Sequence, residues 1–390
     1  MTSDRNTTRR RLLVAATAST AALGALAATM WGRRQDVVKI GVGQPLSGEL
    51  ALMGKDMLQG AQLAADEINA DGGVNIDGRR MQVQIVPADD KASPEVGIEA
   101  ARQLVAADVV AAIAHLNSGV SIAAAPIYAA AGIPQLAIST NPRYTQLGLP
   151  TTLRLVANDD LQALALGSYA AGLPGAQRFA VVDDATPYGK GLADGVAARI
   201  KSGGREVVLR QALDNKTTQF DALLLALAEA KPDVLVSTLA DFQLEVLLPQ
   251  MAARGLAGVA VIGGDNIKTE KLLPLAAKVR ALYATSPIAG AHEFRTGKVF
   301  LEKYRHRFGT DPYYAGHYAY DAVMLLRHAL ERNRSLDRTA LLARLKTFEG
   351  NAPITGTLRM RADGEQRYGA VGVYRLGASG WDLQVRSDRW

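Results

Sequence analysis

The chain has 390 residues, more than one hydrophobic core usually holds, so we expect two domains. Aliphatic residues are frequent and aromatic residues make up 6%, a composition that favours an α/β protein over a β-sandwich. The absence of cysteine excludes disulfides, thiolate metal sites, a cysteine nucleophile and a lipidated cysteine. Residues 1–36 contribute +4 of the net charge of +6, so the rest of the chain has a net charge of only +2. It therefore lacks the excess of basic residues that is typical of nucleic-acid-binding proteins.

Residues 1–36 have the layout of an export signal. The cluster Arg9–Arg11 precedes a run of small apolar residues that carries no charge until Arg33. The adjacent arginines resemble a twin-arginine signal. The alternative is an uncleaved membrane anchor, because about twenty apolar residues can span a bilayer. In both cases we expect the remaining chain to lie outside the cytoplasmic membrane, in the periplasm.

From Val37 onward, short apolar runs alternate with helical patterns. The first series of predicted strands comprises 37–43, 81–87, 108–114 and 134–138, and the second comprises 178–184, 205–211, 233–238, 259–264 and 280–286. Predicted helices in the second series cover 190–202, 217–230 and 241–254. This alternation predicts two parallel sheets in tandem, each with helices on both faces.

After residue 287 the pattern changes to two long helices, at about 294–308 and 314–332, followed by β-rich runs. We expect this tail to return and complete the two earlier lobes rather than to form a third domain. The segment 151–160 is expected to make the first crossing between them.

Motifs for catalysis are absent. The glycine-rich turn at 41–48 lacks the third glycine of the dinucleotide fingerprint, and there is no phosphate loop and no GxSxG elbow. Asp89-Asp90 and Asp183-Asp184 could be acid/base or metal pairs. We interpret them instead as turn and cap residues at strand ends. We therefore expect no enzyme activity, no cofactor and no metal.

The stretch HLNSGVS at 115–121 follows a predicted strand and begins a predicted helix. His115 ends the strand, where a packed or hydrogen-bonded structural role is more typical than that of a base. Ser118 caps the helix in one interpretation. In the other, it lies among free N–H groups at a helix N-terminus, where a carboxylate binds well. The two interpretations are compatible.

A second strand end carries the same kind of residues. The strand that ends at Ile138 is followed by the hydroxyls of Ser139 and Thr140. Ligands in open α/β sheets lie beyond the carboxyl ends of the strands. We therefore expect these hydroxyls and that of Ser118 to converge on one anion without an arginine.

The second series supplies an acid and two aromatic rings. Asp265 follows the predicted strand 259–264, and its carboxylate could face an ammonium group. Tyr188 precedes a helix and Phe242 follows a strand, so their rings could form an apolar or cation-facing wall. Phe242 taken alone is more typical of packing than of recognition.

Several motifs together resemble those of the branched-chain amino-acid (Leu/Ile/Val-type) periplasmic binding proteins, the solute receptors of ABC importers. They include IGVGQPLSGELALMGKDMLQGAQLAADEINADGG, HLNSG, ISTNP, VVDDATPYGKGLADG and YAGHYAYDAV, and the resemblance runs from about residue 38 to the end of the chain. It implies an α/β fold of two Rossmann-like lobes joined by three crossovers, near 157, 286 and 370. The lobes would comprise 37–157 with 287–370, and 158–286 with 371–390, and would close on a ligand by hinge motion.

The resemblance also implies roles for the residues above. Ser118 and the segment Ile138–Thr140 would bind the α-carboxylate and ammonium of an amino acid, Asp265 would pair with the ammonium, and Tyr188 and Phe242 would line the site. Met53 stands where many relatives have an aromatic residue, Phe242 replaces a tyrosine, and Asp265 is shorter than the glutamate of the best-known members. These departures leave the identity of the ligand open.

We therefore expect an exported, monomeric receptor that binds an amino acid of the branched-chain type or an analogue. Its partner would be a membrane ABC permease, and it would bind neither nucleic acid nor a cofactor. The alternative is a sensory or regulatory protein of the same fold that binds an amide or another small organic acid.

Overall fold

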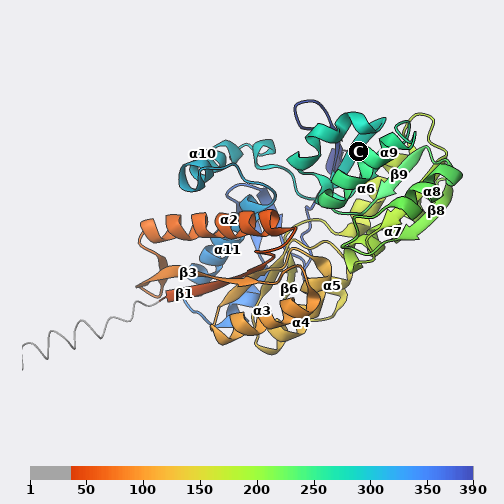
Figure 1. The fold of residues 1–390 in the computed structure, drawn as a ribbon. Helices are drawn as coiled ribbons and strands as arrows, with labels where there is room; N and C mark the ends of the chain where they lie inside the picture. Colours follow the sequence, from red (N-terminus) through yellow and green to blue (C-terminus); the bar gives the residue numbers. More distant parts are fainter. Residues whose placement is uncertain (1–36, 390) are drawn as a thin grey trace, which may run out of the picture.

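The computed structural model describes residues 37–389, so the predicted export signal at 1–36 lies outside the described residues. Two separate sheets form the centres of two lobes that lie side by side (Figure 1). Within residues 37–389, no helix combines the length and the apolar character needed to cross a membrane.

The first lobe is built on a six-stranded sheet of order β2-β3-β1-β4-β5-β6. Its strands are β1 (Val37–Gln44), β2 (Val74–Ile76), β3 (Arg79–Asp89), β4 (Ala111–Ala114), β5 (Gln135–Ala137) and β6 (Thr152–Arg154). All neighbouring pairs are parallel except β2 with β3, which form a hairpin. The carboxyl ends of β1, β4 and β5 therefore meet at one edge of the sheet.

The second lobe is built on a seven-stranded sheet of order β15-β14-β11-β10-β9-β7-β8. Its strands are β7 (Arg178–Asp183), β8 (Glu206–Ala212), β9 (Val234–Ser237), β10 (Ala260–Gly263), β11 (Ala281–Ser286), β14 (Gly372–Leu376) and β15 (Trp381–Arg386). The first five are parallel, whereas β14 and β15 add an antiparallel edge. The remaining strands, β12 (Glu349–Ala352) and β13 (Gly356–Arg359), form a small separate hairpin.

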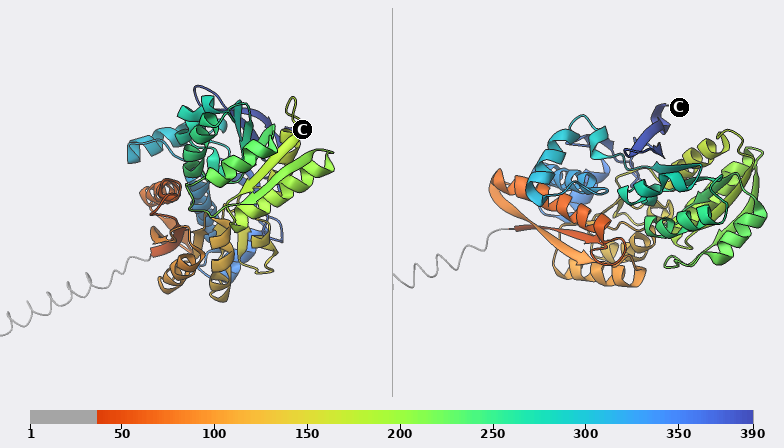
Figure 2. Two further views of the ribbon diagram at one scale, coloured as in Figure 1. Left: turned by 45° about the vertical axis from the view of Figure 1, so that its right-hand side comes forward. Right: turned by 45° about the horizontal axis from the view of Figure 1, so that its top comes forward.

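Helices cover both faces of each sheet, as the alternating pattern predicts (Figure 2). The α-helices are α2 (Ala51–Ala70), α3 (Pro94–Ala106), α4 (Ser118–Ala130), α5 (Arg143–Gln146), α6 (Asp159–Ala171), α7 (Pro187–Ser202), α8 (Asp221–Ala230), α9 (Asp241–Ala253), α10 (Gly297–Phe308), α11 (Gly316–Asn333) and α12 (Arg338–Lys346). The 3₁₀ helices are η1 (Asp265–Ile267), η2 (Glu270–Lys278), η3 (Ala291–Glu293) and η4 (Ser387–Arg389).

Successive side chains along each strand point to opposite faces of the sheet, so they belong to two different hydrophobic cores. Along β9, Leu235 belongs to the cluster that contains Leu248 of α9, whereas Val236 belongs to the cluster that contains Val196 of α7. In the first lobe, α2 and α11 approach closely enough that a Cβ at Gly60 would lie 1.8 Å from the carbonyl oxygen of Gly316. Burial of these apolar faces drives the formation of both lobes.

The chain passes between the lobes three times. It leaves the first sheet after β6, returns after β11 to add α10–α12 to the first core, and ends with β14 and β15 in the second sheet. This architecture confirms the predicted α/β fold class. The residue bounds of the lobes given above stay a prediction.

Some boundaries differ from the sequence-based expectations. The helix expected from 190 begins at Pro187, because the Thr186 side chain accepts a hydrogen bond from Gly189 N at 3.0 Å and caps it. The helix expected from 217 begins at Asp221. The hairpin strand β2 and helix α12 are additions that the apolar periodicity did not indicate.

Candidate ligand-binding site

A cavity of about 960 Å³, called the cleft below, lies between the two lobes. Its walls come from the carboxyl ends of the strands in both sheets, where open α/β sheets usually bind ligands. All eight residues predicted from the sequence line it: Met53, Ser118, Ile138, Ser139, Thr140, Tyr188, Phe242 and Asp265. The fold therefore brings together side chains that are up to 212 positions apart in sequence, counting from Met53 to Asp265.

Ser118 is the first residue of α4 and is 2% exposed. Its expected role as helix cap is wrong, because Asn117 occupies the N-cap position and makes no side-chain capping bond. The Ser118 hydroxyl instead accepts a hydrogen bond from the backbone N–H of Asn141 at 3.2 Å. This bond ties the start of α4 to the segment that follows β5. The first amides of the helix, which have no intrahelical acceptor, lie beside it.

The segment Ile138–Thr140 is buried at the end of β5. The fully buried Arg154 donates to the carbonyl oxygens of Ser139 and of Asn141, the latter at 2.8 Å. Arg154 is itself paired with Glu365 at 3.0 Å. The guanidinium thus fixes the backbone of the segment, while the Ser139 hydroxyl has no hydrogen-bond partner among residues 37–389. That hydroxyl is free to bond a ligand oxygen.

His115 has the structural role that the sequence indicates. It is fully buried, its Nδ1 lies 2.7 Å from Asp90 Oδ2, and its Nε2 lies 3.3 Å from the Tyr128 hydroxyl. The Ser121 hydroxyl accepts from the backbone N–H of His115 and donates to its carbonyl oxygen, each at 3.2 Å. The histidine is therefore engaged away from the Ser118 hydroxyl, and no nucleophile–base pair forms.

The paired aspartates act on backbone and turns. Asp89 accepts from Leu46 N at 2.9 Å, and Asp184 accepts from Thr186 N at 3.0 Å. Asp183 pairs with Arg210 and accepts from Ala185 N. Their oxygens are engaged in holding loops, as expected for structural residues. The described residues contain no cluster of three or more His, Asp or Glu that could hold a metal ion.

Asp265 opens η1 in the second lobe and is 7% exposed. Its Oδ1 accepts from the Tyr188 hydroxyl at 2.8 Å and from Gln162 Nε2 at 3.1 Å. Its Oδ2 accepts from the Tyr314 hydroxyl at 2.6 Å. Burial, followed by the charge of Asp265, raises the pKa of both tyrosines well above the ordinary value. They therefore remain neutral donors that orient the carboxylate.

Gly264 makes this arrangement possible. A Cβ at Gly264 would lie 2.0 Å from the Tyr188 hydroxyl oxygen, so a side chain there would displace the ring from Asp265. The dipeptide Gly263-Gly264 in front of the acid is the sequence signal for this close approach.

Apolar side chains form another wall of the cleft. Phe242 and Val246 project from one face of α9, four residues apart. Leu50 and Leu116 line the first-lobe side together with Met53, which is 3% exposed. This wall can bury an apolar group of a ligand that is anchored at the polar end.

The sequence-based reasoning missed Tyr314. This residue precedes α11 in the first lobe, yet its hydroxyl reaches Asp265 in the second. Asp56 of α2 fixes its position, because Asp56 Oδ2 accepts from Tyr314 N at 2.8 Å and from Gly316 N at 2.7 Å. A second bond between lobes runs from Asn141 Nδ2 to the carbonyl of Pro187 at 2.6 Å. Such contacts depend on lobe assembly. Tyr314 is the first residue of the motif YAGHYAYDAV, but the motif alone does not indicate a contact with the other lobe.

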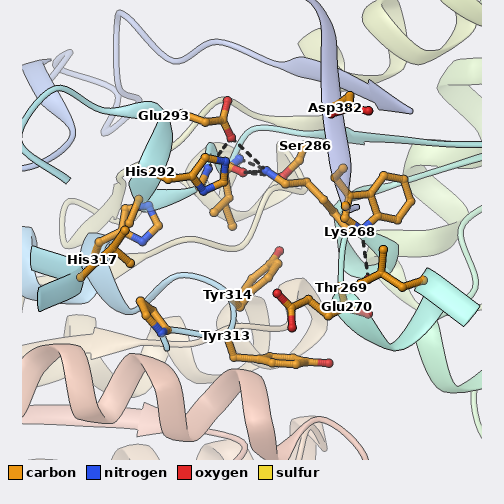
Figure 3. A pocket seen from close by; sticks show the side chains of 18 of the residues that line it. Lys268, Thr269, Glu270, Ser286, His292, Glu293, Tyr313, Tyr314, His317 and Asp382 are labelled. Atoms are coloured by element: carbon orange, nitrogen blue, oxygen red, sulfur yellow. Dashed lines mark hydrogen bonds and ion pairs between the residues drawn. The ribbon is translucent and has the colours of Figure 1, made fainter. Parts of the chain in front are cut away.

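A second, smaller cavity of about 300 Å³ lies beside the crossing after β11 and is called the hinge cavity below. Figure 3 shows the Lys268 side chain extending toward Glu293 across it. Lys268 Nζ donates to the carbonyl of Ile288 at 2.9 Å, lies 3.4 Å from Glu293, and sits 3.8 Å from the ring centre of Tyr374. Burial lowers the pKa of Lys268 to about 8. Tyr314 lines both cavities.

Two α/β lobes joined by three crossovers around a cleft with polar and apolar walls define a two-lobed ligand-binding protein. A sequence model described as "Periplasmic binding protein" matches residues 37–380. The chain belongs to this periplasmic binding protein family.

Similar proteins agree with that membership. Leu/Ile/Val-binding protein homolog 1 of Brucella abortus (strain 2308) is 30% identical over 343 residues, which cover 87% of this chain and 90% of the relative. A leucine-binding protein of Thermotoga maritima has a TM-score of 0.80 at 25% identity, covering 90% and 98% of the two chains. A branched-chain amino-acid transporter substrate-binding protein of Streptococcus pneumoniae, in complex with isoleucine, has a TM-score of 0.78 at 26% identity, covering 90% and 100%. The chain is therefore a solute-binding protein of an ABC transporter, and its family binds small ligands without transforming them.

Proposed function

We propose that this protein binds an amino acid with a branched apolar side chain in the cleft and delivers it to an ABC permease. One observation carries the proposal. Hydroxyls and helix N-terminal amides at Ser118 face a cleft that also holds the buried carboxylate of Asp265 in the opposite lobe. A zwitterion carries one negative and one positive group, so it complements both sides at once.

Each predicted residue then has a role. Ser118, Ser139 and Thr140 bind the α-carboxylate through hydroxyls and backbone amides, and the Ile138–Thr140 backbone also accepts from the ammonium. Asp265 pairs with the ammonium, with the Tyr188 hydroxyl holding its orientation. The side chain of the ligand packs against Phe242 and Met53. The apolar wall of the cleft can bury a branched apolar side chain.

We further propose that the lobes, with bounds 37–157 plus 287–370 and 158–286 plus 371–390, rotate about the three crossovers to enclose the ligand. The export signal at 1–36 directs the protein to the periplasm, where it acts as a monomer. Closure presents a distinct surface that the permease recognises, so release of ligand is coupled to docking.

Calorimetry with protein that has been unfolded, dialysed and refolded tests the proposal, because this treatment removes endogenous ligand. The panel contains leucine, isoleucine, valine, glutamate, lysine, glutamine and benzoate. We expect the branched-chain amino acids to bind with Kd values at least tenfold below those of the other compounds. The absence of heat with every amino acid, or tighter binding of benzoate, would overturn it.

A further inference from the structure

Asn141 connects the two lobes beside the binding site, although it does not itself line the cleft. Its backbone N–H donates to the Ser118 hydroxyl at 3.2 Å, and its side-chain Nδ2 donates to the carbonyl of Pro187 at 2.6 Å. Pro187 begins α7 and precedes Tyr188, whose hydroxyl donates to Asp265 at 2.8 Å. One residue therefore joins Ser118 in the first lobe to the segment that carries Tyr188 in the second.

The hydrogen bonds of Asn141 fix the orientation of its side chain. Its Oδ1 accepts from Arg143 N at 3.0 Å, so Nδ2 is the atom that faces the Pro187 carbonyl. Exchanging the two atoms would oppose two donors at one end and two acceptors at the other. The Arg154 guanidinium also donates to the carbonyl oxygen of Asn141 at 2.8 Å. The amide that reaches the second lobe thus has a rigid base in the first.

Two glycines allow the lobes to approach each other at this contact. A Cβ at Gly119 of α4 would lie 3.2 Å from ring carbons of Pro187. A Cβ at Gly191 of α7 would lie 2.7 Å from Asn141 Nδ2, closer than folded proteins allow. Any side chain at Gly191 would therefore displace the amide from the Pro187 carbonyl. The bond between the lobes depends on both of its sides.

The contact lies beside the first crossing between the lobes. The backbone N–H of Asp159, at the start of α6, donates to the carbonyl of Thr140, one residue before Asn141, at 2.8 Å. Atoms near the axis of a hinge rotation move least when two lobes close. A hydrogen bond at this place can therefore persist while the cleft narrows.

We propose that Asn141 is a positioning residue that holds Ser118 and Tyr188 in a fixed relation and forms the contact about which the lobes turn. Without its bond to Pro187, the second lobe samples more orientations, and only a fraction of them presents both halves of the site. The apparent affinity for ligand falls by that fraction. The effect on affinity rests on the proposed function, whereas the spread of lobe orientations does not.

Two substitutions break the bond from opposite sides. Asn141→Asp keeps the acceptor for Arg143 N but places a carboxylate oxygen against the Pro187 carbonyl, and the two acceptors repel each other. Gly191→Ala leaves Asn141 unchanged but displaces its amide, and alanine favours the helical conformation of α7. Both variants retain the backbone N–H that donates to Ser118.

Each substitution has a matched control. Asn158→Asp makes the same change of charge near the same crossing, but Asn158 caps α6 through Asp160 N and Leu161 N, and aspartate caps equally well. Gly203→Ala adds a methyl group at the end of α7, where a Cβ would lie in ordinary contact, 3.4 Å from the nearest carbonyl oxygen.

Distances between the lobes, measured by pulsed electron paramagnetic resonance, report their relative orientation. The chain has no cysteine, so Gln103→Cys on α3 and Glu229→Cys on α8 provide one exposed site for a spin label in each lobe. In the absence of ligand, we expect a broader distance distribution for Asn141→Asp and Gly191→Ala than for the wild type. Both controls should match the wild type.

Calorimetry with leucine tests the effect on binding in the same variants. At about pH 8 the new carboxyl group of Asn141→Asp is ionised. We expect Kd values roughly 2–10-fold above that of the wild type for both bond-breaking variants, and wild-type values for the controls.

The possible outcomes separate the two proposals. An unchanged distance distribution in either folded variant would overturn the role of Asn141, and so would a loss of affinity without a change in the distribution. Should Asn141→Asp not fold, Gly191→Ala decides alone. If the wild type does not bind leucine, the proposed function fails, whereas the distances still test the link between the lobes.

Discussion

The cleft and the hinge cavity differ in how their polar groups are satisfied. In the cleft, the side-chain oxygens of Ser139, Asn117 and Asn266 are buried without partners among the residues described. In the hinge cavity, Lys268 and Glu293 pair with each other, and Glu293 also accepts from the Tyr374 hydroxyl at 3.0 Å.

This difference separates a site for binding from a site for stability. A cavity whose polar groups already pair internally gains little from a ligand, because those pairs would have to break first. His317 is an exception in the hinge cavity: its Nε2 lies 2.9 Å from the carbonyl oxygen of Ala289, but its buried Nδ1 has no partner among residues 37–389. In the cleft, unpaired oxygens and an oriented carboxylate can gain bonds when a ligand arrives. Substitutions in the cleft should therefore change ligand affinity, whereas substitutions in the hinge cavity should change the free energy of unfolding.

The largest effect on affinity is expected for Asp265→Asn. The substitution keeps the size of the side chain but removes the charge that we propose pairs with the ammonium. Loss of one partner of a buried charge pair costs about 2–5 kcal/mol, so leucine should bind roughly 30-fold more weakly or worse. Calorimetry measures this, with Asp160→Asn as the control that binds normally. If Asp265→Asn bound leucine with wild-type affinity, Asp265 would not be a ligand-binding residue.

Ser118→Ala should have the next largest effect. The change removes a hydroxyl at the start of α4 that can bond the ligand carboxylate, at a cost of about 1.5–3 kcal/mol, or roughly 10–150-fold in Kd. Ser202→Ala, at the exposed end of α7, is the matched control and should bind as the wild type. Equal Kd values for both variants would contradict the assignment of Ser118.

Tyr314→Phe should have a smaller effect. The ring remains, but the hydroxyl no longer orients Asp265 or bridges the lobes, and the ammonium can partly replace its hydrogen bond. We expect affinity to fall by about 0.5–1.5 kcal/mol, roughly 2–10-fold. Fluorescence titration beside Tyr368→Phe, an exposed tyrosine, measures the difference. A gain in affinity would show that the hydroxyl competes with the ligand.

Glu293→Gln should leave affinity within about twofold of the wild type, because Glu293 is already paired with Lys268 in the hinge cavity and does not line the cleft. The variant should nevertheless lower the free energy of unfolding by about 1–3 kcal/mol, since the buried Lys268 loses its charge partner. Urea denaturation of the ligand-free protein measures the loss. A marked loss of affinity with unchanged stability would reverse the proposed roles of the two cavities.

Much of the fold could be predicted because buried parallel strands are continuous apolar runs. The five strands predicted in the second series all correspond to strands of the structure, β7–β11. Strand β2 has three residues and no such run, yet its turn carried a signal: Asp77 and Gly78 both have positive φ, at 50° and 83°. An Asp-Gly pair of this kind marks a two-residue hairpin. Helix α12 likewise begins at a usable cap, since the Asp337 side chain accepts from Ala340 N at 2.7 Å.

The first-lobe half of the site and Asp265 follow strand ends, so the rule for open sheets could locate them. Tyr314 could not be found in this way. Its hydroxyl contacts Asp265 from the opposite lobe, and this contact arises from the packing of the lobes rather than from a strand end. The prediction that Ser118 caps α4 was wrong for a similar reason, because its hydroxyl accepts a hydrogen bond from Asn141 N in a different segment.

The most direct test of the central claim is a crystal structure of the protein grown with leucine. The account predicts the ligand carboxylate within hydrogen-bond distance of the Ser118 hydroxyl and the start of α4, and the ammonium within the same distance of Asp265. A ligand bound in the reverse orientation, or one that occupies the hinge cavity and leaves the cleft to solvent, would contradict it.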